Sequence, residues 1–279
     1  MIENVISTLK KQRIFKDLFN YEVVYGGSIN QTYSLLTDAG KFFVKCQSSC
    51  PSDFFECEKE GLEVLNEHVF TPNIIFQSEK MLVLEWLNLS DLKNEKEAKE
   101  AGKALAKLHR ETSNNIFGFD QANYIGSLTQ TNSKQKEGKT FYINCRWKPL
   151  VESVFREDER LKETLLEKLN ALVEQLPEEQ PCLLHGDLWS GNIGVCNGKV
   201  YFFDPSVYYG YRETDLAMAR LFGGFPEAFF KSYNIEFPLL KGWKERISLF
   251  QLYPVLVHAK LFGGAYKDQA AQLILGRLT

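Results

Sequence analysis

The spacing of apolar residues changes along the first third of the chain, from helical intervals to strand-like runs and back. Residues 1–20 carry apolar side chains three and four positions apart, which predicts a short leading helix. Runs rich in β-branched and aromatic residues at 21–27, 31–37 and 41–46 predict three strands separated by turns. Residues 53–68 return to helical spacing, and 73–77 and 80–87 predict two more strands.

The rest of the chain has mainly helical patterning. Helices are predicted at 95–112, near 147–156, at 158–176, and through 217–222 and 247–262, whereas the polar, turn-rich segment 118–140 predicts a long surface loop. Residues 192–204 predict a strand pair with a turn at Asn197-Gly198. The order predicts an α+β fold of two lobes, a β-rich lobe at 1–87 and a helical lobe at 88–279, joined near Glu85–Leu87.

Length and charge narrow the possible partners. The 279 residues exceed the usual single core, with 44% hydrophobic and 25% charged residues, which is an ordinary globular mixture. The formal charge of −3 gives no overall attraction to nucleic acid or to an anionic membrane, and no apolar run is long enough to span a bilayer. The charged N-terminus lacks the apolar stretch of a signal peptide. We therefore expect a cytoplasmic protein with neither nucleic acid nor membrane as partner. A monomer is favoured, and the sequence leaves the oligomeric state open.

The six cysteines fit that compartment. Cys46, Cys50 and Cys57 lie close together in the sequence, but their spacing contains no C-x-x-C pair. Reduced, partly buried thiols explain them better than a zinc site.

The most specific pattern is the sequence HGDLWSGN at 185–192. Asp187 precedes Asn192 by five positions, the spacing of the kinase catalytic loop, with glycine where kinases carry arginine. Asp187 would orient an attacking hydroxyl and accept its proton, and Asn192 would bind the metal. Asp204, at the end of the apolar run 200–203, would be a second Mg²⁺ ligand, and the intervening hairpin would bring it beside Asn192. Either aspartate alone could be a turn residue, but the combination predicts phosphoryl transfer from ATP.

The predicted small lobe supplies a cation for the phosphates. Lys45 closes the strand 41–44 and resembles the lysine of the kinase V-A-I-K motif. A carboxylate on the following helix would fix its position. Glu58 is the preferred partner because it shares a helix face with the apolar residues, and Glu56 and Glu60 are the competing candidates.

Two further segments are predicted to contact the nucleotide, only because of where they lie in the chain. A turn between strands, at Gly26, Gly27 and Ser28, could cover the phosphates with backbone N–H groups, although it matches neither a Walker A motif nor G-x-G-x-x-G and could be an ordinary hairpin turn. Backbone groups at the joint between the lobes could pair with adenine; these residues are Glu85, Trp86 and Leu87.

The segment 208–217 follows the metal carboxylate closely. Tyr209 and Arg212 are expected to bind the substrate, whereas Asp215 could either cap a helix or brace the catalytic-loop backbone. His185 is expected to hold that loop. Only ten residues separate Asp204 from Asp215, too few for a protein-kinase activation loop, so a small hydroxylated substrate is preferred over a peptide.

Taken together, these segments resemble the fructosamine kinase family. LLHGDLWSGN, FFDPSVYYGYRETDLAMARLFGGFP and QLYPVLVHAKLFGGAY carry the resemblance, and GGSINQTYSL, FFVK, EKEGLEVL, LVLEWL and NYIGSLTQTN extend it over nearly the whole chain. HGDLWSGN and LFGGFP are far more specific than the shared kinase residues. The resemblance implies a bilobal protein-kinase-like fold and transfer of the ATP γ-phosphate to the 3-hydroxyl of a ketosamine, free or on a glycated protein, as deglycation repair.

The resemblance also implies roles for single residues. Trp189 would stack on the ketosamine, the alternative being a buried core indole. Many members carry a redox-sensitive cysteine where this chain has Ser28, so disulfide switching is not expected there. The family often has a tryptophan where this chain has Gly138, which leaves the amine-bearing half of the substrate open.

Two other functions compete with ketosamine phosphorylation. One is a kinase for another small hydroxylated amine, such as an aminoglycoside or choline, and the LFGGFP and LWSGN blocks argue against it. The other is a catalytically silent nucleotide-binding protein, and the intact set of Lys45, Asp187, Asn192 and Asp204 argues against that.

Overall fold

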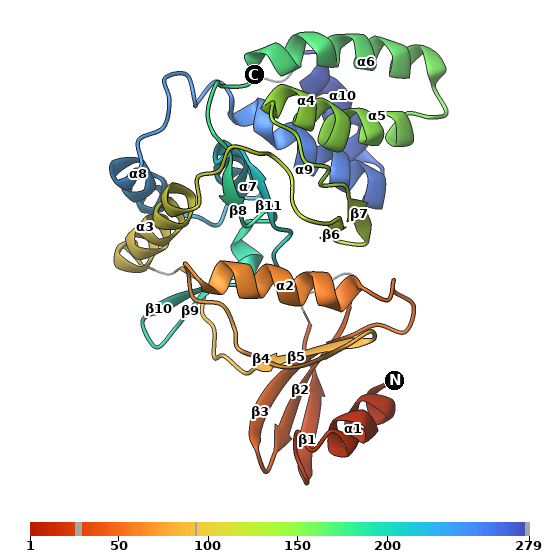
Figure 1. The fold of residues 1–279 in the computed structure, drawn as a ribbon, viewed down its shortest axis with the longest axis vertical. Helices are drawn as coiled ribbons and strands as arrows, with labels where there is room; N and C mark the ends of the chain where they lie inside the picture. Colours follow the sequence, from red (N-terminus) through yellow and green to blue (C-terminus); the bar gives the residue numbers. More distant parts are fainter. Residues whose placement is uncertain (26–29, 93, 277–279) are drawn as a thin grey trace.

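The computed structural model describes residues 1–25, 30–92 and 94–276. A five-stranded antiparallel sheet with the order β1-β2-β3-β5-β4 forms one end of the molecule, and helices form the other (Figure 1). The first part contains α1 (Ile2–Lys11), β1 (Leu18–Val23), β2 (Gln31–Thr37), β3 (Gly40–Cys46), α2 (Phe54–Asn66), β4 (Ile74–Ser78) and β5 (Met81–Glu85). The α+β prediction is confirmed, while the division at residues 87 and 88 stays a prediction.

The sheet has an apolar core on each face. Alternate residues of β3, Phe42 and Val44, pack with Val5 and Leu9 of α1 on one face. On the other face, Leu82 and Leu84 of β5 pack against α2, which crosses between the sheet and the helical part (Figure 1). The predicted leading helix over 1–20 is too long, because α1 ends at Lys11 and the chain has already entered β1 by residue 18.

The helical part begins with α3 (Glu95–Glu111). It continues through β6 (Asn123–Ile125), β7 (Leu128–Gln130), α4 (Gly138–Tyr142), a π-helical segment (Ile143–Trp147), α5 (Lys148–Val154), α6 (Glu159–Leu172), a 3₁₀ turn (Val173–Gln175) and β8 (Cys182–Leu184). A second 3₁₀ turn (Ser190–Asn192) precedes β9 (Ile193–Cys196), β10 (Lys199–Phe202), β11 (Tyr208–Gly210), α7 (Glu213–Leu221), α8 (Glu227–Glu236), α9 (Ile247–Phe262) and α10 (Ala265–Ile274).

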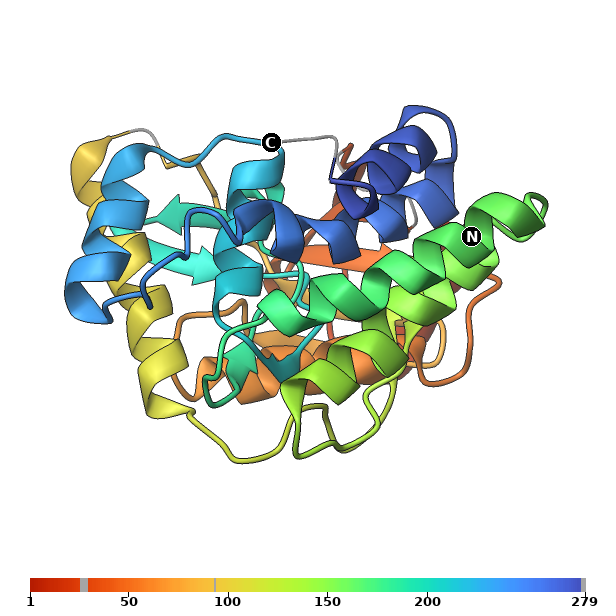
Figure 2. The same cartoon turned by 90° about the horizontal axis from the view of Figure 1, so that it is seen from above.

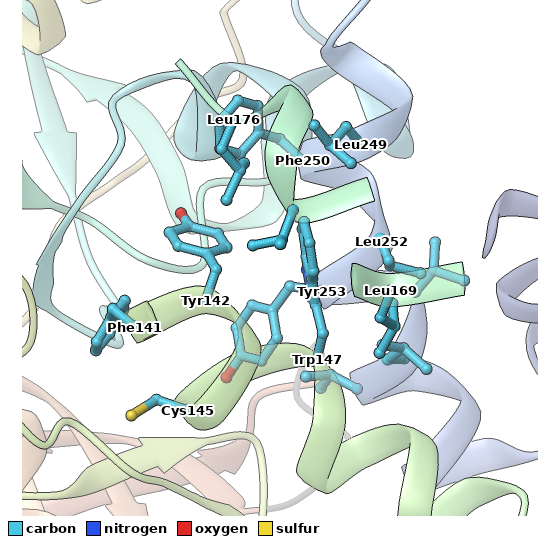
Figure 3. Close-up of a cluster of buried hydrophobic side chains, with 14 of the residues drawn as sticks. Phe141, Tyr142, Cys145, Trp147, Leu169, Leu176, Leu249, Phe250, Leu252 and Tyr253 are labelled. Atoms are coloured by element: carbon cyan, nitrogen blue, oxygen red, sulfur yellow. The ribbon is translucent and has the colours of Figure 1, made fainter. Parts of the chain in front are cut away.

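Two apolar clusters stabilise the helical part. In one, Tyr142 and Trp147 pack against α9 at Phe250 and Tyr253 (Figure 3). In the other, α3 packs against α8, and seen from above these two helices lie on the opposite side from α10 (Figure 2). Among the described residues, no helix combines the length and the apolar character that a bilayer span requires.

The segment 118–140 differs from the predicted surface loop. It contains the hairpin of β6 and β7, and three of its polar residues are almost fully buried: Asn123, Gln130 and Asn132 are 5%, 2% and 3% exposed. Their amides replace the apolar side chains that would have indicated buried structure, so the hydrophobic pattern missed them. Gly138 is also buried, and a Cβ at this position would overlap the Tyr211 ring. At position 138, where the family often has a tryptophan, the space beside the backbone is therefore filled by the Tyr211 side chain.

The close packing of α3 on α8 depends on one glycine. A Cβ at Gly102 would overlap the carbonyl oxygen of Phe229 and the hydroxyl of Ser232. In an exposed helix, alanine would stabilise by about 1 kcal/mol relative to glycine. Here we expect Gly102→Ala to lower the free energy of unfolding by about 1–3 kcal/mol. Urea unfolding followed by circular dichroism measures the change. The neighbouring exposed substitution Lys103→Ala is the control, and an unchanged or increased stability of Gly102→Ala would contradict the packing argument.

Candidate active site

A cavity of about 500 Å³ lies between the sheet and the helical part. Its lining includes all four residues that the sequence assigned to phosphoryl transfer, Lys45, Asp187, Asn192 and Asp204. They come from β3, the loop after β8, and the two ends of the β9–β10 hairpin. Tertiary structure therefore brings together side chains that are up to 159 positions apart in the chain.

Lys45 reaches the cavity from the α2 face of the sheet. It pairs with Leu82 of β5, whose side chain packs toward α2, so the strand alternation directs the lysine the same way. Its Nζ lies 2.6 Å from Glu58 Oε1. Of the competing partners, Glu56 is exposed and Glu60 accepts a hydrogen bond from Gln121.

The same ammonium also contacts the helical part, 2.8 Å from Asp204 Oδ1. Lys45 and Glu58 are only 5% and 8% exposed, so both charges depend on this pairing. Burial disfavours the charged lysine, but the two carboxylates outweigh burial and raise its pKa above the ordinary value. Burial raises the pKa of Glu58, and the charge of Lys45 opposes that rise.

The β9–β10 hairpin places Asn192 beside Asp204, as its predicted turn at Asn197 requires. Cys196 and Lys199 pair directly, and Asn197 has a φ of 51°, a conformation that asparagine tolerates. The Nδ2 of Asn192 donates to the carbonyl oxygen of Asp204 at 3.4 Å. Asp204 itself has a φ of 58°, and its side chain is half exposed toward the cavity.

Asp187 carries a perturbed carboxyl. The Nδ2 of Asn192 donates to the Asp187 backbone oxygen at 2.9 Å and to Oδ2 at 3.2 Å. Burial, and secondly the negative charge of Asp204, raise the pKa of Asp187 to about 7, and the hydrogen bond from Asn192 opposes the rise. A carboxyl in this range is suited to accept a proton near neutral pH.

Asp215 braces the loop before Asp187. Its Oδ2 accepts from the His185 N–H at 2.8 Å and its Oδ1 from the Gly186 N–H at 2.9 Å. Because α7 begins at Glu213, Asp215 is not the helix cap, and the alternative left open by the sequence is decided. His109, fully buried, lies 3.2 Å from Asp215 Oδ2 and is a support that sequence patterns missed.

His185 supports the loop from within. Burial lowers its pKa, so the ring is neutral near pH 7. Its Nε2 lies 3.1 Å from the Phe203 carbonyl oxygen and donates to it, while Nδ1 accepts from the Asp187 N–H at 3.3 Å. The ring therefore joins the loop that carries Asp187 to the strand end that carries Asp204.

Two predicted substrate residues lie elsewhere. The Arg212 guanidinium is buried and donates to Glu179 and to the carbonyl oxygens of Phe237 and Pro238, each at 2.8 Å. Tyr209 stacks on Phe119, away from the cavity lining. The Arg212 assignment is corrected to a structural role, because its guanidinium is buried among these partners, whereas the substrate role of Tyr209 stays a prediction.

The predicted nucleotide segments are placed only in part. Gly26, Gly27 and Ser28 lie outside the described residues, although Tyr25 and Asn30 on either side line the cavity.

Backbone N–H groups at the joint between the lobes form hydrogen bonds within the protein. The Glu85 N–H donates to the Asn73 carbonyl oxygen at 2.9 Å, and the Trp86 N–H to that of Lys41 at 3.3 Å. These two donors are therefore engaged inside the small lobe, and pairing with adenine would rest on the Glu85 carbonyl and on Leu87.

A second cavity of about 340 Å³ opens next to the first. Asp187 and Trp189 line both cavities, and the rest of the second lining is apolar except for His258. Trp189 is half-buried with its indole against Gly191, so it is a wall of the site and not a core residue. His258 contacts Phe222 and its Nδ1 lies 2.8 Å from the Pro254 carbonyl oxygen; burial lowers its pKa. The sequence offered no partner for this histidine.

Comparison with known proteins identifies the chain. The family model for fructosamine kinase matches residues 1–279. The chain belongs to the fructosamine kinase family. A probable ketoamine kinase of Enterococcus faecium is 37% identical over 90% of this chain and 92% of its own length. A protein-ribulosamine 3-kinase of Arabidopsis thaliana, from the chloroplast, is 34% identical over 90% of this chain and 80% of its length.

Solved structures confirm the protein-kinase-like fold. A crystal structure from Thermobifida fusca assigned as a fructosamine-3-kinase superposes with a TM-score of 0.82 at 29% identity, covering 94% of each chain. The choline kinase LicA of Streptococcus pneumoniae, at 16% identity over 99% of this chain and 98% of its own, has a TM-score of 0.67, a likeness of fold alone. The predictions of a kinase and of its family are confirmed, and membership of this family implies the use of ATP.

The buried ion pair of Lys45 and Glu58 gives a stability test. Lys45→Met leaves Glu58 buried without its cation, and we expect a loss of about 3–5 kcal/mol in the free energy of unfolding at pH 7. Replacing the partner too, as in Lys45→Met with Glu58→Gln, removes the stranded charge and should restore most of the stability but none of the turnover. Urea unfolding and a kinase assay on the same samples separate the two effects. Equal stability of the single and double variants would contradict the pairing.

The raised pKa of Asp187 predicts a pH-dependent stability. The folded state holds this proton up to about pH 7, whereas an unperturbed aspartate releases it near 3.8. The contribution of the carboxyl to folding is therefore present below about pH 4 and is lost as pH rises through 7. Asp187→Asn, neutral throughout, should gain about 5–10 °C in Tm relative to the wild type as pH rises from 5 to 8, equivalent to about 2–3 kcal/mol. A constant difference in Tm over that interval would show that Asp187 titrates normally.

Proposed function

We propose that this protein transfers the γ-phosphoryl group of ATP to the 3-hydroxyl of a ketosamine. The observation that carries the proposal is the position of Asp187, which lines both the polar cavity containing Lys45 and the neighbouring apolar cavity. A carboxylate at that junction can contact an acceptor hydroxyl on one side and a phosphoryl group on the other. The named relatives, a ketoamine kinase and a ribulosamine 3-kinase, support ketosamines as the acceptor class.

The residues divide the work of an in-line displacement. Asp187 orients the acceptor hydroxyl and takes its proton as the oxygen forms a bond to the γ-phosphorus, and ADP leaves with the β–γ bridging oxygen. Lys45, fixed by Glu58, would bind phosphate oxygens by exchanging part of its contact with Asp204. The Glu85 carbonyl and the Leu87 N–H would hold adenine, in keeping with the two donors already engaged nearby.

The donors in the cleft also fit Mg²⁺. Three carboxylates, Glu58, Asp187 and Asp204, face one ammonium, so the site carries an excess of negative charge before nucleotide arrives. The Asn192 nitrogen is engaged with Asp187, which leaves its carbonyl oxygen as the available ligand, and Asp204 is half exposed. Two oxygen ligands plus phosphates and water are the usual surroundings of Mg²⁺, which when bound neutralises phosphate charge.

The apolar lining of the second cavity indicates which substituent on the amine of the acceptor would fit there. Among the described residues that line it, Asp187 is the only carboxylate, and His258 is neutral near pH 7 because burial lowers its pKa. A polycationic aminoglycoside would gain no ion pairs there beyond Asp187. A sugar amine whose substituent is an aliphatic stem, such as a glycated lysine side chain, would bury that stem against Trp189 and the apolar wall. Phosphorylation at the 3-position would then make the adduct prone to decompose, which is the basis of deglycation.

Parallel kinetic assays test the acceptor and the base together. We expect turnover in a coupled ADP-release assay with glycated lysine, ribulosamine or erythrulosamine, and none with kanamycin or choline. Asp187→Ala should lower kcat by about 10²–10⁴-fold, the usual contribution of a general base, while ATP binding measured by calorimetry survives.

Asp120→Asn is the matched control, since this carboxylate is exposed and paired with Lys134 outside the cavity. Turnover of kanamycin or choline in place of every ketosamine would overturn the acceptor assignment. Full turnover by Asp187→Ala would remove Asp187 from its role.

A further inference from the structure

Arg146 is a fully buried cation whose charge meets no carboxylate. It lies in the π-helical segment after α4, with an exposed fraction of 0%. Its Nη1 donates to the carbonyl oxygens of Thr131 at 2.6 Å and Cys145 at 3.0 Å, and its Nη2 to Asn132 Oδ1 at 2.7 Å. Across the described residues, no acidic side chain lies within ion-pair distance of the guanidinium.

Aromatic rings enclose this guanidinium. The Cζ atom of Arg146 lies 4.0 Å from the centre of the Tyr208 ring and 4.5 Å from the centre of the Phe141 ring. Among the described residues, its Nε has no hydrogen-bond partner. Figure 3 shows its neighbours in the chain, Cys145 and Trp147, on the turn that packs near Tyr253. Cation–π contacts offset part of the desolvation cost, but an apolar residue of similar size would avoid that cost altogether. The packing of the core therefore does not explain why a cation is here.

The guanidinium fixes the orientation of a chain of buried amides. Because arginine can only donate, Asn132 must turn its oxygen toward Arg146, and its Nδ2 then donates to Asn123 Oδ1 at 3.0 Å. Asn123 Oδ1 also accepts from Gln130 Nε2 at 2.8 Å. With its oxygen engaged, Asn123 donates through Nδ2 to the Val207 carbonyl oxygen at 2.8 Å. The direction that the cation imposes agrees with the one imposed by backbone carbonyl oxygens, which can only accept: those of Gln121, Val207 and Ser206 take the N–H groups of Asn132, Asn123 and Gln130.

That chain of amides ends at the active site. Gln130 Nε2 also donates to the Ser206 carbonyl oxygen at 3.1 Å, two residues after Asp204. The Ser206 hydroxyl donates in turn to the Tyr124 carbonyl oxygen at 2.7 Å. Asn123, Tyr124 and Ser206 all line the cavity of about 500 Å³. The amides therefore tie the β6–β7 hairpin to the segment that carries the metal carboxylate.

The hairpin also forms a wall for the acceptor. Ile125 lines the second cavity, and Gly126 lines both. We propose that Arg146 is a positioning residue for acceptor binding, acting through Asn132 and Asn123 to hold this wall against the catalytic segment. The proposal rests on the proposed function for the identity of the acceptor, but its structural part concerns the hairpin alone.

Asn132→Asp separates this role from a contribution to stability. The new carboxylate still accepts from Arg146 and gives it the ion pair that it lacks, which offsets the loss of the bonds to Asn123 and Gln121, so Tm should fall less than in Arg146→Met. The carboxylate cannot donate, however, and it faces the oxygen of Asn123, so the chain of amides is broken at its first link. We expect at least a tenfold rise in the KM for the ketosamine with the KM for ATP changed less than twofold. Amides of residues 123–130 should also lose hydrogen-exchange protection.

Arg146→Met and Leu169→Ala form a matched pair of core variants. Both side chains are fully buried, but Leu169 belongs to the apolar cluster and to none of these hydrogen bonds. At equal loss of Tm, only Arg146→Met should raise the KM for the ketosamine. If both variants, or neither, raise it, Arg146 is merely structural and the inference is wrong. Unchanged protection of 123–130 in Asn132→Asp would also overturn it.

The hydrogen-exchange result does not depend on the acceptor. If the wild type phosphorylates no ketosamine, the proposed function fails, while the exchange measurement still decides whether Arg146 holds the hairpin. If the wild type is active and Asn132→Asp matches it in both KM values, the inference alone fails.

Discussion

One ammonium group joins the two parts of this kinase. Lys45 comes from the sheet, and its two carboxylate partners come from α2 and from the strand end after β10. Because the lysine is buried, its charge depends on these carboxylates, of which Glu58 lies in the same part as the lysine and Asp204 in the other. The ion pair with Asp204 thus links the sheet to the helical part, and the two ion pairs together hold the lysine where phosphates would bind.

The same arrangement raises the pKa of a neighbouring carboxyl, that of Asp187. Three acidic groups around one cation repel each other, and the raised pKa of Asp187 records burial together with the charge of Asp204. In the proposed mechanism the same repulsion would favour a bound cation near Asp204 and would keep Asp187 able to accept a proton near neutral pH. Asp215 and His185 hold the loop so that the repulsion changes protonation and not the backbone.

The β6–β7 hairpin of the helical part packs directly against the small lobe. The hairpin of β6 and β7 contacts α2, since the Tyr124 hydroxyl donates to Asp53 at 2.8 Å and its ring packs on Phe54. The same hairpin is also held by hydrogen bonds among the buried amides of Asn123, Gln130 and Asn132, the last of which accepts from Arg146. A segment rich in polar residues is therefore ordered by hydrogen bonds on both sides, where apolar packing alone would leave its orientation undetermined.

The sequence by itself determined the proposed catalytic set, and the structure places its members around one cavity, because phosphoryl transfer constrains residue type and spacing over short distances. Asp187 and Asn192 lie in one loop, and a two-residue turn carries Asp204 back to them. The strand alternation around Lys45 and the helix face of Glu58 are equally local. These features follow from backbone geometry with periods of two and 3.6 residues.

Only the tertiary structure decided the residues whose roles depend on distant partners. Arg212 looked available for substrate but is engaged by Glu179 and two backbone carbonyls. Asp215 could have been a cap until α7 was seen to begin two residues earlier. The buried amides at 123–132 look like loop residues in any linear pattern, since hydrophobic periodicity cannot register polar groups buried by mutual hydrogen bonding.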